Sequence, residues 1–301
     1  ILFVMKKIVL FLILGVLITP FTFQKSEGSL ISDRSYRAEM NKENRKEVKQ
    51  IKNLFKIHET YANNHDIKGL ETLYSDKYMN NDGFGKEVYF KSIKETWDTC
   101  KDLTYETKIV SINVSGDYAS INVEETASGT ITDMLDSNPI AGELHSKSTG
   151  IYYLEKVNEK WFIVGETALT DESSLLYGDA RFMNIEIQAP NQVSAGEVYT
   201  TTVKVDAEPD MFIIGAIDRD TVTYPTSTPK SELRAMPQSQ TLERLLKANT
   251  DNLNEYAVAS LAISKAKNVQ DATYQIYMAG LVCVMKRVNV IPKNNFIKVE
   301  D

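Results

Sequence analysis

The chain has 301 residues, of which 43% are hydrophobic and 25% are charged, and its formal net charge is −7 at pH 7. This composition is typical of a globular protein, and the length allows two average domains after a leader segment. The acidic balance argues against nucleic acid as a partner, because nucleic-acid binding needs a clustered basic surface.

The N-terminus carries the pattern of an export signal. Met5, Lys6 and Lys7 precede an apolar run over residues 8–19, as in signal peptides. That run is shorter than the ~20 residues of a membrane-spanning helix, although reading through to Phe23 lengthens it. Residues 1–23 are therefore predicted as a signal peptide or a membrane anchor, and the protein as extracytoplasmic, either periplasmic or secreted. We expect contact with a membrane only through this segment.

A polar stretch and three helices are predicted next. Residues 24–43 are rich in Ser, Glu, Lys, Arg and Asn, which favours a flexible tether. Beyond it, apolar residues recur at three- and four-residue steps and predict a helix over residues 44–64. Two more helices are predicted over residues 67–74 and 87–100, with a turn at residues 80–83 between them.

The second part of this domain has the pattern of strands. Four strands are predicted, at residues 105–114, 118–126, 149–157 and 161–168. The polar stretch 133–148 is predicted as a long connection that carries His145. Three helices followed by an antiparallel meander predict an α+β domain over residues 44–178, with the helices on one face of a curved sheet.

Three segments resemble the nuclear transport factor 2-like superfamily, and within it the SnoaL-like and ketosteroid-isomerase-like proteins. They are residues 63–70 (NNHDIKGL), residues 73–78 (LYSDKY), and the closing hairpin with Tyr152, Tyr153 and Trp161. The resemblance implies a cone-shaped domain with a ligand cavity between the sheet and the helices. The superfamily contains isomerases, dehydratases, cyclases and members that only bind. Dimerisation of the cone domain is a further expectation.

The resemblance also supplies candidate site residues. Ketosteroid isomerases use a carboxylate after the second helix as a proton-transfer base, and Asp82 has that position here. His58 stands where the family has a tyrosine oxyanion donor, with Tyr61 one turn further along. Asp82 and His58 are thus the catalytic candidates, and the expected pocket consists of His58, Tyr61, Asp82, Trp97 and Tyr153.

Each candidate also has a plain structural interpretation. Asp82 lies in an Asn-Asp-Gly turn, where an Asp side chain commonly bonds the local backbone. His58 fits a partly buried histidine that is satisfied by a backbone carbonyl, and Trp97 fits an ordinary core residue. Glu124 and Glu166 lie on predicted strands, but nothing in the sequence selects either as a second acid.

Residues 182–298 are predicted as an all-β domain. Strands are predicted near residues 183–188, 198–205, 211–217, 255–264 and 273–291. Residues 223–240 form a Pro-rich loop, and residues 241–248 have helical spacing. Short strands joined by turns favour a β-sandwich of the immunoglobulin-like kind. Residues 187–190 (IQAP) and 195–197 (AGE) resemble the start of bacterial immunoglobulin-like modules.

Cysteine and histidine usage gives no sign of a metal centre. Cys100 and Cys283 lie in different predicted domains among apolar neighbours, as buried thiols do. The three histidines show no zinc-ligand spacing. We therefore expect no metal and no cofactor.

The functional expectation follows from the lack of any convergent acid, base or nucleophile. We expect the chain to be an exported cell-envelope protein whose cone domain binds a small apolar ligand or an envelope protein, without catalysis. One alternative is an exported isomerase or lyase with Asp82 as its base. Another is a purely structural module with a filled cone.

Overall fold

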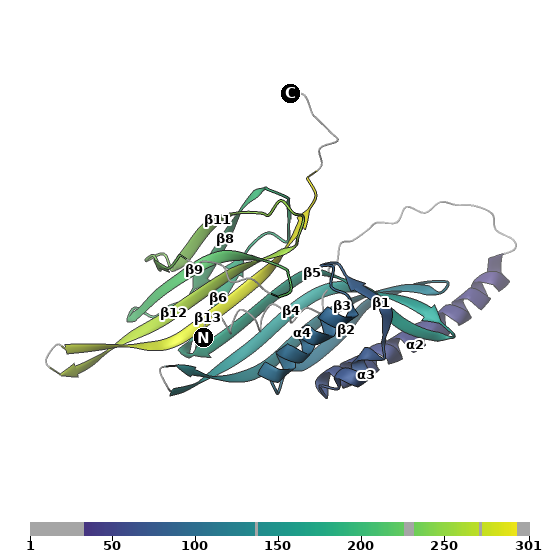
Figure 1. Cartoon of the computed structure of the whole chain (residues 1–301), viewed down its shortest axis with the longest axis horizontal. Helices are drawn as coiled ribbons and strands as arrows, with labels where there is room; N and C mark the ends of the chain where they lie inside the picture. Colours follow the sequence, from purple (N-terminus) through teal and green to yellow (C-terminus); the bar gives the residue numbers. More distant parts are fainter. Residues whose placement is uncertain (1–32, 136–137, 226–231, 271–272, 294–301) are drawn as a thin grey trace, which may run out of the picture.

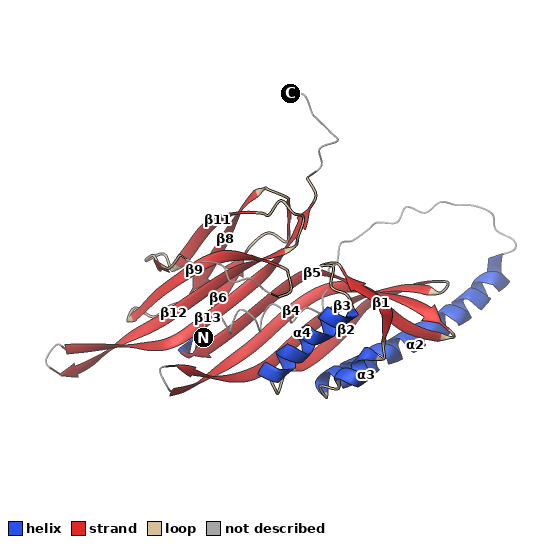
Figure 2. Ribbon diagram, in the orientation of Figure 1, coloured by secondary structure: helices blue, strands red, loops and turns tan. Residues whose placement is uncertain are grey.

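A computed structural model describes residues 33–135, 138–225, 232–270 and 273–293 of the chain (Figure 1). The described chain is mostly β-structure with few helices (Figure 2). The predicted leader, residues 1–23, and the first part of the predicted tether, residues 24–32, lie outside the described residues. Among the residues that are described, no helix is long and apolar enough to cross a membrane.

The first half of the chain contains the helices and five strands. The helices are α2 (Asp33–Asn63), α3 (Ile67–Glu71) and α4 (Lys86–Thr99). The strands are β1 (Tyr74–Asn80), β2 (Thr104–Ser115), β3 (Tyr118–Leu135), β4 (Asn138–Val157) and β5 (Lys160–Gly178).

The second half follows a short 3-10 helix, η1 (Asp179–Phe182), and is built from strands. They are β6 (Ile185–Gln188), β7 (Gln192–Ser194), β8 (Val198–Val205), β9 (Met211–Thr221), β10 (Arg234–Ala235), β11 (Thr241–Lys247), β12 (Glu255–Gln270) and β13 (Thr273–Ile291).

Two sheets organise these strands. The main sheet has the order β10-β9-β12-β13-β5-β4-β3-β2, with β1 parallel to β5 and β7 parallel to β13. The small sheet has the order β11-β8-β6. Figure 1 shows α4 and α2 lying against the half of the main sheet that contains β2–β5, while the small sheet covers the other half.

Two hydrophobic cores result from this layering. One lies between the helices and the main sheet and includes Ile51, Phe55, Ile121 and Ile163. The other lies between the two sheets and includes Val203, Leu242, Leu261 and Val284. Alternate residues of β12 and β13 therefore point into different cores, because side chains alternate across a strand.

The helical region differs from the sequence-based prediction at two places. In place of a flexible tether up to residue 43, the structure has α2 from Asp33 onward. The helix-favouring Arg, Ala, Glu, Met and Lys residues of this stretch explain its propagation. The helix predicted over residues 67–74 ends at Glu71, and the chain continues as β1, whose Tyr74 pairs with Ile163 of β5. The parallel pairing with β5 is a tertiary contact that local periodicity does not reveal.

Two predicted loop or helical segments are strands. The predicted connection at residues 133–148 belongs to the long β3–β4 hairpin, in which His145 pairs with Ser128. The predicted helical turns at residues 241–248 are β11, which pairs with β8 throughout. Leu242 and Leu246 point into the core while Leu245 is exposed, as the two-residue period of a strand requires.

The main sheet runs without a break between the two predicted domains. Gly280–Lys286 of β13 pair with Glu172–Gly178 of β5 in an antiparallel ladder. The predicted boundaries at residues 178 and 182 fall at η1, between β5 of the main sheet and β6 of the small sheet. The main sheet itself joins the two predicted domains, because β13 of the second pairs with β5 of the first.

Candidate functional site

A group of buried polar side chains lies between the helices and the main sheet, and we call it the polar core cluster. Each of its members is at most 5% exposed. They are His58 of α2, Tyr74 and Tyr78 of β1, Tyr89 of α4, Glu125 of β3, Tyr152 of β4 and Glu166 of β5.

Strand geometry places the two glutamates in this interior. Glu125 lies two residues after Val123 and therefore on the same inward face of β3. Glu166 follows a β-bulge in β5, where Tyr153 pairs with Gly165 but Leu154 pairs with Ile163. The bulge reverses the alternation, so that Glu166 points inward opposite Tyr152. Gly165 also lets β1 approach, since a Cβ there would be 2.9 Å from the Met79 carbonyl oxygen.

The aromatic members of the cluster pack closely. The ring centroid of Tyr74 is 5.0 Å from that of Tyr78 and 5.7 Å from that of Tyr89. Tyr78 and Tyr89 are 4.9 Å apart, and His58 lies 6.0 Å from Tyr152. The helix-covered interior is thus filled largely by rings that carry polar groups.

Only some of these polar groups are paired. His58 Nε2 and the Tyr74 hydroxyl are 2.8 Å apart, and the Tyr89 hydroxyl donates to Glu166 Oε2 at 3.3 Å. Thr107 donates its hydroxyl to Glu125 Oε1 at 3.0 Å. Five other buried atoms of the cluster have no well-aligned hydrogen bond within the described chain: His58 Nδ1, Tyr78 Oη, Glu125 Oε2, Tyr152 Oη and Glu166 Oε1. Four of them belong to two interacting pairs, Tyr78 with Glu166 and Tyr152 with Glu125.

These five atoms are unusual because buried polar groups are nearly always hydrogen-bonded. An unpaired buried group costs about 1–3 kcal/mol, so poorly aligned or missing hydrogen bonds at these positions make the cluster costly to bury. The cluster therefore places hydrogen-bond donors and acceptors side by side inside a closely packed interior.

Burial shifts the pKa values of the cluster's glutamates and histidine towards their uncharged forms. Burial raises the pKa of Glu166 to about 8 and raises that of Glu125 well above its ordinary value. Burial also lowers the pKa of His58 to about 4, so its imidazole is neutral. Desolvation by burial, which disfavours the charged form, is the largest cause in all three.

Asp82 lies outside this cluster and is fully engaged elsewhere. Its Oδ1 accepts from Arg287 Nη2 at 2.6 Å and from Asn254 Nδ2 at 2.8 Å, and its Oδ2 accepts from Arg287 Nη1 at 3.1 Å. The Asp82 and Arg287 side chains are 1% and 0% exposed. The turn role expected for Asp82 belongs to Asn80, whose Oδ1 accepts from the N–H groups of Asp82 and Phe84.

The other predicted pocket residues are dispersed. The Tyr61 ring lies over Gly69, where a Cβ would be 2.8 Å from it. Trp97 stacks on His65, with ring centroids 4.7 Å apart, and donates its indole N–H to the Tyr105 hydroxyl at 2.9 Å. Tyr153 is 40% exposed, because its neighbour Tyr152 takes the inward position.

Of the five predicted pocket residues, only His58 lies in the polar core cluster. Its partner is a tyrosine hydroxyl in place of the expected backbone carbonyl. The alternation of Ala119, Ile121 and Val123, continued by one step, points to Glu125. The inward position of Glu166 has no comparable signal, because it depends on the bulge between Ile163 and Gly165.

Comparisons with known proteins give structural likeness only. No protein-family model matches the chain, and no curated protein matches it. A conserved protein from Planctomyces limnophilus is similar over 41% of this chain and 94% of its own, with 12% identity and a TM-score of 0.35. The hexachlorocyclohexane dehydrochlorinase LinA-type3 from Novosphingobium barchaimii covers 42% of this chain and 88% of its own, with 12% identity and a TM-score of 0.35. A putative dehydratase from the NTF2-like family, from Streptomyces avermitilis, covers 40% of this chain and 93% of its own, with 13% identity and a TM-score of 0.32.

Proposed function

We propose that the protein is an exported binding protein whose helix-covered interior holds a small, uncharged, hydrogen-bonding molecule and performs no reaction on it. The observation that carries this proposal is the set of five buried atoms in the polar core cluster that have no well-aligned hydrogen bond. Because both donors and acceptors are present, the fitting ligand has hydroxyl, amide or carbonyl groups on a compact frame. This ligand is more polar than the apolar one expected from the sequence.

We infer that residues 44–178 form a cone of the nuclear transport factor 2-like type, followed by a sandwich of the immunoglobulin-like type. The succession of α2, α3 and α4 before the meander β2–β5 supports the first assignment. The packing of β9, β12 and β13 on the small sheet supports the second. Export is supported by the basic and apolar pattern of residues 5–19.

The absence of catalysis in this proposal follows from protonation and pairing. A general base must be unprotonated at the working pH, and the pKa of about 8 keeps the Glu166 carboxyl mostly protonated near pH 7. Burial raises the pKa of Glu125 in the same direction, which also disfavours its use as a base. Asp82, the base of the isomerase alternative, has its carboxylate oxygens occupied by Arg287 and Asn254.

Tyrosine-to-phenylalanine variants test the proposal through the sign of a stability change. If the Tyr78 and Tyr152 hydroxyls hold a ligand, Tyr78→Phe and Tyr152→Phe should each lower the free energy of unfolding of protein as purified, by about 0.5–1.5 kcal/mol. If the hydroxyls are simply unpaired, their removal relieves an unmet desolvation cost and the variants should be more stable than wild type. That second result favours the purely structural module with a filled interior. Tyr118→Phe, at a 62% exposed position, is the matched control and should change little.

Native mass spectrometry gives an independent reading. The purified wild-type protein should carry a non-covalent adduct of small mass that is absent under denaturing conditions. The Tyr78→Phe/Tyr152→Phe double variant should carry less of it, and Tyr118→Phe should carry as much as wild type. An adduct-free wild type with stabilised phenylalanine variants would contradict the proposal.

A further inference from the structure

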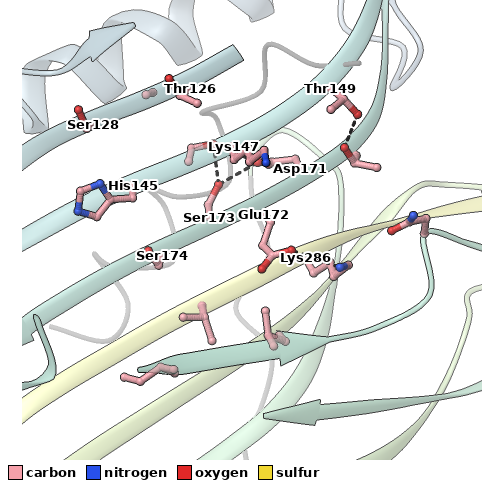
Figure 3. A pocket seen from close by; sticks show the side chains of 17 residues that line it. Thr126, Ser128, His145, Lys147, Thr149, Asp171, Glu172, Ser173, Ser174 and Lys286 are labelled. Carbon is pink, nitrogen blue, oxygen red and sulfur yellow. Dashed lines mark hydrogen bonds and ion pairs between the residues drawn. The ribbon is translucent and has the colours of Figure 1, made fainter. Parts of the chain in front are cut away.

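The small sheet leaves part of the main sheet uncovered. Its strands pack on β9, β12 and β13, and its edge strand β6 lies nearest the neighbouring strand β5. Beyond β6 lies a groove of about 780 Å³, walled by Ile185 and Ile187 and floored by β3, β4 and β5 (Figure 3). We call it the β6 groove.

The backbone of β6 has a free edge along this groove. Among the described strands, β6 pairs with β8 alone, on its other side. Asp206 donates its N–H to the Asn184 carbonyl, which makes residues 184 and 206 a hydrogen-bonded pair. Bonded and non-bonded pairs alternate in an antiparallel ladder, so Ile185 and Ile187 direct their N–H and C=O groups away from β8. These are the two β6 residues that line the groove.

The floor of the groove carries a ladder of charged side chains. Thr126, Lys147, Glu172 and Lys286 stand directly opposite one another on β3, β4, β5 and β13. Glu172 forms an ion pair with Lys286 at 3.2 Å, and Figure 3 shows the two side chains together. Lys147 makes no ion pair or hydrogen bond in the part of the chain that the structure describes. One carboxylate thus faces two ammonium groups, although the whole chain has a net charge of −7.

We propose that the β6 groove binds an extended acidic peptide segment of another protein, which adds to β6 as a fourth strand of the small sheet and places a carboxylate on Lys147. The free edge supplies main-chain hydrogen bonds, as in other cases of strand addition. The unpaired Lys147 supplies the charge preference.

The groove floor also indicates the side-chain pattern of the occupant. Alternate residues of an added strand face the floor. Around Lys147 the floor presents the polar groups of Ser128, His145, Thr170 and Ser174. Polar or acidic residues are therefore favoured at every second position of the bound segment.

Fluorescence anisotropy with designed peptides tests this proposal on the full chain. The probe is a fluorescein-labelled, C-terminally amidated octapeptide of four Val-Glu repeats. It should bind at least tenfold more tightly than the Val-Gln and Val-Lys peptides of equal length. It should also bind at least tenfold more tightly than a Val-Glu peptide whose alternate backbone nitrogens are methylated. Equal binding of the methylated peptide would mean charge attraction without strand addition and would overturn the proposal.

Two variants locate the site. Lys147→Ala should weaken binding of the Val-Glu peptide at least tenfold, with an unchanged circular dichroism spectrum because Lys147 is exposed. Lys247→Ala, an exposed lysine on the opposite edge strand β11, should leave binding unchanged. Equal losses from both variants would overturn the proposal. Free glutamate that competes as strongly as the peptide would also overturn it. So would sedimentation that finds a dimer of the chain which the peptide does not dissociate.

Discussion

The buried ion pair between Asp82 and Arg287 makes the most specific prediction about stability. The two residues lie 205 positions apart in the chain and come from the two halves of the molecule. Asp82→Asn keeps the size of the side chain but leaves the Arg287 guanidinium, which is 0% exposed, without its counter-charge. Breaking a buried pair in this way typically costs about 3–5 kcal/mol. At about 2–4 °C per kcal/mol for a protein of this size, Tm should fall by roughly 6–20 °C.

Thermal unfolding followed by circular dichroism measures this effect, and an exposed pair provides its control. Asp98 pairs with Lys94 at 2.7 Å and with Lys101 at 3.1 Å, and all three side chains are more than half exposed, so Asp98→Asn should change stability far less than Asp82→Asn. The double variant Asp82→Leu/Arg287→Met removes both buried charges and should recover much of the loss. The reasoning is refuted if Asp82→Asn shifts Tm no more than Asp98→Asn, or if the two losses at Asp82 and Arg287 simply add.

Three further predictions concern pH, domain division and location. Folded Glu166 holds its proton up to a pKa of about 8, while an unfolded glutamate releases it near 4.5, so stability should fall as pH rises through this interval. His58, whose pKa is lowered, opposes this trend only below about pH 6.5. Glu125, whose pKa burial also raises, follows the same trend as Glu166, so Glu166→Gln should reduce the slope of the curve between pH 6.5 and 8. Residues 44–180 expressed alone test the predicted domain division, since β5 then lacks its ladder with β13. A cooperative unfolding transition of this fragment supports the division, and an unfolded fragment contradicts it. Cell fractionation should find the protein outside the cytoplasm, and full-length protein in the cytosol would remove the basis for export.

Periodicity in the sequence predicts those parts of the fold that depend on local pattern. The helices near residues 44–64 and 87–100 and the strand pair at residues 105–126 follow from it directly. Residues 241–248 have helical spacing, yet residues 241–247 form a strand because β8 pairs with them. Residues 74–80, where no strand is predicted, form one because β5 pairs with them. Such partners lie far along the chain and leave no mark on the local sequence.

The same distinction applies to the candidate site. His58 follows from its place on the inward face of a helix, and Glu125 lies on the extrapolated inward face of a strand. Asp82 was selected by its position after the second helix, but its partner Arg287 is distant in the chain, and only the three-dimensional structure reveals it. Glu166 is turned inward by a bulge, which depends on pairing with β4 and not on residue alternation.

A high-resolution crystal structure of the purified chain tests the central claim most directly, through the electron density inside the polar core cluster. We predict density for a small molecule within hydrogen-bonding distance of the Tyr78 and Tyr152 hydroxyls and of Glu166 Oε1. Rings closed against one another, with these same atoms hydrogen-bonded among themselves and no further density between them, would contradict a binding function for the interior.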